Sequence, residues 1–348
     1  MTRGSARRRA IVALVVVVGA CKPGGSTGTK ITSKPPAGVR LTDPQALLTG
    51  IAGFEAAFKS PAVRSVTGLA AMVSVPAAAP LGGVAECGGG ATAAGPLLSP
   101  LGVFPDSDLG RILVFDSATG KFQIGADSGG PAGGVEFVLP AVDSLNRVRF
   151  PLQSTGTLDL FDVTPPGGLL TLHSVVAGAG SAADYTFVDS GTATAYAGML
   201  TGKVSGGGRS YSFRDSTTGL YLQVTAGATL TDSASGARMT LTATRTATDP
   251  FDSYYNLDFT FFSSAQAVRL LGSITTYCLL PSIGLTVSVN DTDYAVVNQG
   301  QSGPVVTALD SALTPAQDSA IQALIRGQGE MFSWLTALAQ PAKQFLGP

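Results

Sequence analysis

Tyr255-Asn-Leu-Asp-Phe-Thr-Phe261 alternates apolar and polar side chains without a break. Because successive side chains of a β-strand point to opposite faces, this period of two predicts a strand with one buried face and one wet face. The same alternation recurs at 135–139, 210–214, 220–225, 239–244 and 283–289. Strands with one wet face are typical of antiparallel sheets, whereas parallel strands are usually buried on both faces.

Three segments share the pattern Asp-Ser-x-x-Gly, at 116–120, 215–219 and 232–236. An Asp at the start of a turn accepts a hydrogen bond from the backbone two residues on, and a closing Gly supplies a positive φ. We therefore expect three hairpin loops. Calcium is the less favoured interpretation, because no loop has the alternating carboxylates and closing Glu of a calcium-binding loop. In all we expect about twelve strands.

Helical periodicity appears only near the two ends of the chain. Thr42 or Asp43 can cap a helix that has Pro44 in its first turn, and Pro61 is expected to end it. Its apolar face is formed by Leu47, Leu48, Ile51, Phe54 and Phe58. A capping box at 314–317 precedes a second apolar stripe over 321–338, which Gly327 and Gly329 interrupt.

Strands with one apolar face must be covered, by closure into a barrel, by a second sheet, or by helices. The order helix, strands, helix favours the last solution. We expect a mainly β (α+β) fold, with a large curved antiparallel sheet or half-barrel of about twelve strands and an N-terminal and a C-terminal helix on one face. Residues 41–348 form a single domain on this interpretation.

The first twenty residues have the pattern of a secretory signal. Arg3 and Arg7–Arg9 precede an unbroken apolar stretch from Ala10 to Ala20. This stretch is shorter than the roughly 20 apolar residues that a membrane-spanning helix needs. Residues 1–20 are therefore predicted to be a signal peptide.

Val18-Gly19-Ala20-Cys21 resembles the lipobox of bacterial lipoproteins. The resemblance covers 21 residues and implies that Cys21 receives a diacylglycerol, that cleavage occurs before it, and that its new amine is acylated, as with palmitate. Lys22 stands where an Asp commonly causes inner-membrane retention, which implies the outer membrane. Residues 22–40 are rich in Gly, Ser, Thr and Pro, so residues 21–40 are interpreted as the lipidated Cys and a flexible tether.

The expected architecture resembles the half-barrel of periplasmic lipoprotein carriers, whose curved sheet and helical lid enclose an apolar ligand. This resemblance lies in architecture alone, with no shared motif, and a fold does not by itself determine a function.

Composition limits the partners. Lys and Arg number 22 and Asp and Glu number 23, and removal of the four signal-peptide arginines leaves the acidic residues in excess. A body without a concentrated basic surface is not expected to bind nucleic acid. Two cysteines remain after Cys21. In an oxidising compartment Cys87 and Cys278 are predicted to form a disulfide rather than two free thiols.

The segment 125–131, Gly-Ala-Asp-Ser-Gly-Gly-Pro, resembles the nucleophile segment of chymotrypsin-like proteases, with Ala126 in place of a Gly. That family carries its catalytic His upstream of the Ser, whereas the single His of this chain, His173, lies downstream of Ser128. Without an upstream imidazole the mechanism lacks its general base, so we interpret the segment as a loop. A dyad of Cys87 and His173 competes with the disulfide, and a zinc site lacks enough ligands.

No catalytic residue, metal ligand or cofactor is therefore assigned; Walker and Rossmann motifs are not found. We expect a non-catalytic, lipid-anchored lipoprotein of the cell envelope, held at the membrane through Cys21, that binds an apolar small molecule or an envelope protein. The alternative is a hydrolase of envelope polymers. An apolar cavity beneath the helices would favour the first, and converging carboxylates in a polar cleft would favour the second.

Overall fold

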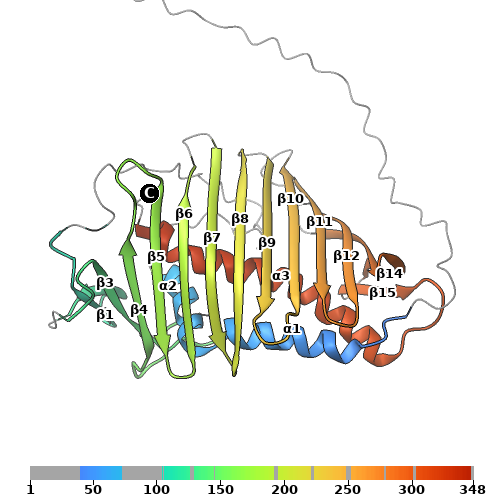
Figure 1. Ribbon diagram of the computed structural model, residues 1–348, viewed down its shortest axis with the longest axis horizontal. Helices are drawn as coiled ribbons and strands as arrows, with labels where there is room; N and C mark the ends of the chain where they lie inside the picture. Colours follow the sequence, from blue (N-terminus) through green and yellow to red (C-terminus); the bar gives the residue numbers. More distant parts are fainter. Residues whose placement is uncertain are drawn as a thin grey trace, which may run out of the picture. The chain divides into compact units, whose positions relative to one another are not determined.

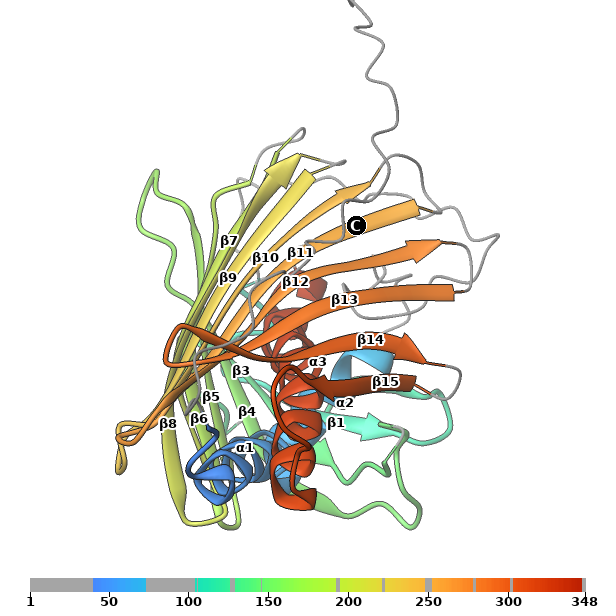
Figure 2. The ribbon, with the colours of Figure 1, turned by 90° about the vertical axis from the view of Figure 1, so that its right-hand side faces the viewer.

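The computed structural model describes residues 40–72, 104, 106–125, 129–144, 146–191, 195–220, 223–247, 252–277, 280–300 and 303–345. Fifteen strands in this part of the chain form one sheet, in the order β15 through β3 and then β1 and β2. Every neighbouring pair is antiparallel except β1 and β3, which run parallel. The sheet is curved and does not close (Figures 1 and 2). The mainly β fold class expected from the sequence is confirmed.

The elements follow the chain as a meander between helices. The helices are α1 (Pro44–Phe58), α2 (Pro61–Met72) and α3 (Pro315–Phe345). The strands are β1 (Ile112–Asp116), β2 (Lys121–Ile124), β3 (Gly134–Pro140), β4 (Ser154–Asp162), β5 (Leu170–Gly178), β6 (Ser181–Asp189), β7 (Ala195–Gly206), β8 (Arg209–Leu220), β9 (Gln223–Asp232), β10 (Arg238–Ala247), β11 (Asp252–Phe262), β12 (Ala267–Tyr277), β13 (Leu280–Val289), β14 (Thr292–Gly300) and β15 (Gly303–Ala308).

The three helices lie within the curve of the sheet (Figure 2). Helix α1 packs on β7 and β8, α2 packs on β3 to β6, and α3 packs on both other helices and on β15. The inward face of each strand supplies the core, as alternation predicted: Leu257, Phe259 and Phe261 of β11 are at most 3% exposed. None of these helices is both long enough and apolar enough to cross a membrane.

Both predicted helix starts are confirmed. The Asp43 carboxylate accepts a hydrogen bond from the Ala46 N–H at 2.8 Å, with Pro44 at the first helical position. At α3, Thr314 and Gln317 bond reciprocally, each backbone N–H donating to the other's side chain. Helix α3 continues through Gly327. The absence of a side chain there allows α3 to lie close to α1, because a Cβ at residue 327 would lie 3.2 Å from Ile51 Cγ2.

A second helix, which was not predicted from the sequence, begins close to the end of the first. Pro61 does follow the end of α1, but it also begins α2. A proline is tolerated in the first turn of a helix, where its missing N–H has no partner to lose. The apolar residues behind it, including Val63 and Val66, are fully buried.

Two of the three predicted hairpin loops are confirmed. Asp116 and Asp232 each accept the backbone N–H two residues on, and Gly120 and Gly236 each have a φ of 69°. The third prediction is wrong, because residues 215–219 lie inside β8. Gly219 serves a close approach between strands, since a Cβ there would lie 2.2 Å from the Gln223 carbonyl oxygen.

The predicted strand at 220–225 is also wrong. Leu220 ends β8 and Gln223 begins β9, and the two residues pair directly across the hairpin. Alternation of apolar residues continues through this segment, so the pattern gives no sign of the reversal.

Candidate functional site

The structure describes only some of the residues that the sequence analysis considered. Cys21, Cys87 and Cys278 lie outside the described residues, as do Asp127 and Ser128 of the protease-like segment. Lipidation and the disulfide therefore stay predictions. Gly129 to Pro131 lie between β2 and β3, where the sequence predicted a loop.

His173 lies on the outward face of β5. Its Nε2 is 2.8 Å from Asp184 Oδ1 on β6, and its ring stacks on Phe161 of β4 at 5.7 Å. The Asp184 side chain is 70% exposed. His173 is therefore a strand residue with a hydrogen-bond partner on the outward face.

Two further carboxylates share this outward face. Glu136 of β3 and Asp159 of β4 are direct cross-strand partners, and both are half-buried. Burial raises the pKa of both carboxyls, and the charge of Asp159 raises the pKa of Glu136 further. Asp159 Oδ1 is buried, and no described residue gives it a hydrogen bond. Within the described ranges, no three His, Cys, Asp or Glu side chains gather closely enough to hold a metal ion.

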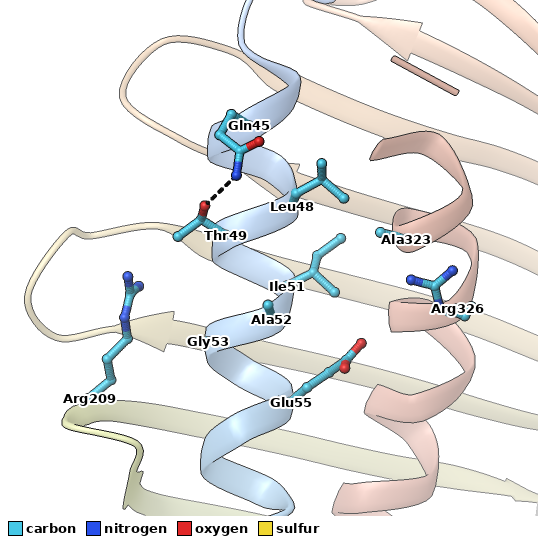
Figure 3. Close-up of a pocket in the computed structure, with 10 residues that line it drawn as sticks. All are labelled: Gln45, Leu48, Thr49, Ile51, Ala52, Gly53, Glu55, Arg209, Ala323 and Arg326. Atoms are coloured by element: carbon cyan, nitrogen blue, oxygen red, sulfur yellow. Dashed lines mark hydrogen bonds between the residues drawn. The ribbon is translucent and has the colours of Figure 1, made fainter. Parts of the chain in front are cut away.

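A hollow of about 480 Å³ lies over α1, between α3 and the start of β8 (Figure 3). Its floor is apolar, with Leu48, Ile51 and Ala323, and it is open to solvent. Arg326 and Glu55 point into the space between the two helices, while Arg209 lies on the other side of α1. A second open hollow, of about 530 Å³, also includes Arg209 and is lined by turns between strands.

The Arg209 side chain is positioned by a buried carboxylate. Its Nη1 donates to Asp232 Oδ2 at 3.2 Å, and Asp232 is only 2% exposed. Hydrogen bonds from Ser235 and Ala234, together with Arg209, lower the pKa of Asp232 although burial opposes them. The buried Tyr211 hydroxyl lies beside Gly53, without a hydrogen bond of standard geometry. Burial raises the pKa of Tyr211, and nearby Arg209 offsets part of that rise.

A half-buried row crosses the inward face of β9 to β13, near the ends of these strands that lie away from α1. Consecutive members are direct cross-strand partners: Val224, Arg245, Tyr255, Ile274 and Ile283. We call this set the inner row. At the opposite ends of the strands, Phe261 touches α1 at Gly50. Figure 1 shows α1 and α2 crossing the lower halves of the strands. The inner row lies further along: in β11, Tyr255 is six residues from Phe261, the residue that meets α1.

Some of these residues were predictable from the sequence and others were not. The turn at Asp232 was predicted, but its ion pair with Arg209 was not, because the pair joins two separate hairpins. The inner row depends on the register of five strands, which no local pattern reveals. Comparisons of the chain with family models, with curated proteins and with solved structures found no match.

Proposed function

We propose that this chain is a non-catalytic lipoprotein of the cell envelope, anchored through lipid on Cys21, whose curved sheet binds an apolar ligand at the inner row. The observation that carries the proposal is the inner row itself. Four of its five side chains are apolar or aromatic, yet all five are only partly buried on the concave face. Partly exposed apolar side chains inside a concave surface are typical of ligand sites.

The anchor is supported by the order of basic cluster, apolar stretch and Cys21 in the sequence. By the same resemblance, Lys22 favours the outer membrane. Two or three acyl chains hold a protein stably at a bilayer, whereas one chain does so only weakly. A lipid-anchored body with an apolar concave face is suited to carrying or storing a hydrophobic molecule next to the membrane.

The test is native mass spectrometry with lipid extraction on residues 22–348, exported to the periplasm with a cleavable signal. These residues retain the whole compact unit from Pro35 to Pro348. We expect an apolar molecule to co-purify and to be released on denaturation. Ile274→Asp should abolish its recovery, because the substitution places a charge in the inner row.

Thr275→Asp is the matched control, because residue 275 is the next residue of β12 and faces outward. Its preparation should retain the ligand. A wild-type protein free of any small molecule would contradict the proposal, as would equal loss from both variants. Recovery of a stoichiometric envelope protein instead would identify a partner in place of the ligand.

The hydrolase alternative has one observation in its favour, the opposed carboxylates Glu136 and Asp159 with raised pKa values. Paired carboxyls perform acid–base chemistry on glycosidic bonds. They lie on the outward face, and neither lines either of the two hollows described above. Release of soluble sugars from purified envelope polymers by the wild type, and not by Glu136→Gln, would favour this alternative.

A further inference from the structure

The outward faces of β3 and β4 place two like charges directly opposite each other. Glu136 and Asp159 are register partners, a spacing that brings Cβ atoms to about 5 Å. Opposed like charges destabilise a strand pair. The repulsion between the two side chains is largely removed when one of the two carboxyls is protonated.

The second observation is the orphan oxygen of Asp159. Its Oδ1 is buried and lacks a hydrogen-bond partner among the residues that the structure describes, although a buried acceptor is normally satisfied. A carboxylate only accepts hydrogen bonds, whereas a protonated carboxyl also donates one. A proton held between the two side chains would supply the missing donor. Burial, which raises the pKa of both carboxyls, and the charge of Asp159, which raises the pKa of Glu136 further, act in the same direction.

The neighbouring strands provide no cation in register with the pair. Next to Glu136 on β1 stands Ile112, and next to Asp159 on β5 stands Val175. Beyond Val175, on β6, the row continues with Asp184, which already bonds His173. Lys203 follows on β7, two strands further than Val175. Arg111, which precedes β1, meets Glu136 through its backbone carbonyl, and its side-chain Nε is directed to the Ser107 carbonyl.

We propose that Glu136 and Asp159 share one proton across β3 and β4, and that this shared proton makes the β1–β4 end of the sheet a pH-responsive latch. With the proton bound, a carboxyl–carboxylate hydrogen bond joins the strands. When it is lost to solvent, two carboxylates oppose each other and the pairing weakens. A carrier in an envelope exposed to changing external pH would thereby loosen one end of its sheet as the pH rises.

The sign follows from linkage. A carboxyl whose pKa is higher in the folded than in the unfolded state binds its proton more tightly when folded. Its contribution to stability is present below the unfolded pKa and is lost as pH rises through the folded value. The latch therefore closes on acidification and opens towards neutral and alkaline pH.

The first experiment is a carbon-detected NMR titration of Asp and Glu carboxyls in residues 22–348, with signals assigned by Asp159→Asn and Glu136→Gln. We expect one carboxyl of the pair to titrate above the usual range. Asp159→Asn should move the midpoint of Glu136 downward. Two midpoints in the usual range, or a Glu136 midpoint unchanged by Asp159→Asn, would overturn the proposal.

The second readout is hydrogen exchange of the β3 and β4 amides, compared with β10 and β11 in the same sample. Protection of β3 and β4 in the wild type should fall as pH rises, beyond the intrinsic increase in exchange, and Asp159→Asn should remove this excess. Asp258→Asn is the matched control, because Asp258 is an outward carboxylate bound to Arg269 at 2.7 Å. The Asp258→Asn protein should be less stable than the wild type at neutral pH, whereas the Asp159→Asn protein should be more stable. A loss in both variants would indicate a merely structural role.

Discussion

Gly50 lies where α1 approaches a strand of the sheet closely. A Cβ at residue 50 would lie 2.4 Å from Phe261 Cζ and 2.6 Å from Cε2. Phe261 is 1% exposed, so its ring can move away only by displacing other core side chains. Alanine in a helix interior is favoured over glycine by about 1 kcal/mol, whereas overpacking a core costs about 1–3 kcal/mol. With two ring carbons this close we place the cost at the upper end, so Gly50→Ala should lose about 2 kcal/mol net.

The matched control is Gly329→Ala in α3, where no atom of the described residues outside the local helix backbone lies within 4 Å of the new Cβ. Only the helix propensity acts there, so this variant should gain about 1 kcal/mol. Urea unfolding can be followed by fluorescence of Trp334, the single tryptophan, which is 7% exposed and stacks on Phe58. Far-UV circular dichroism gives a second probe of the same transition. Equal shifts in both variants, or a Gly50→Ala protein as stable as the wild type, would refute the close contact between Gly50 and Phe261.

Three further outcomes are expected. Cys21→Ser should abolish incorporation of labelled palmitate and recovery in the membrane fraction, and an acylated Cys21→Ser protein would exclude this anchor. The intact mass of residues 22–348 without reductant should be lower by two hydrogens if Cys87 and Cys278 are bonded, and free thiols reacting with iodoacetamide would refute the pairing. Tyr211→Phe should change the free energy of unfolding by less than about 1 kcal/mol, because the buried hydroxyl has no standard hydrogen bond to lose. A larger decrease in the free energy of unfolding, measured in urea, would show that the Tyr211 hydroxyl does make a hydrogen bond.

The Asp-Ser-x-x-Gly pattern predicted a turn correctly at Gly120 and Gly236, where the glycine has a positive φ, and wrongly at Gly219. Asp116 and Asp215 begin segments of the same form, yet only the first is a turn. In β8, Thr217 and Thr218 are β-branched and pair with Gly198 and Ala197 of β7, so the ladder continues through the motif. The motif is local, whereas the neighbouring strand that decides its conformation lies about twenty residues earlier.

The carboxylate pair shows why a site on a sheet escapes sequence analysis. Glu136 was recognised as the polar member of an alternating strand, and such a residue is ordinarily solvated. Its partner Asp159 is brought opposite by the register of β3 and β4, after a long connection. A shift of one residue would place Asp159 on the core face, so the pair exists only because the apolar residues fix that register.

The helix glycines, by contrast, carried a usable signal. Glycine in a helix interior costs about 1 kcal/mol relative to alanine, so its presence calls for a compensating contact. At Gly50, Gly53 and Gly327 that contact exists: Phe261, Tyr211 and Ile51 occupy the space of the absent side chain. A glycine on the apolar side of a predicted helix therefore indicates where the backbone approaches a neighbour, although not which one. In the described part of the chain nothing lies near Gly329, and the same argument makes it a helix glycine whose replacement by alanine should stabilise the protein.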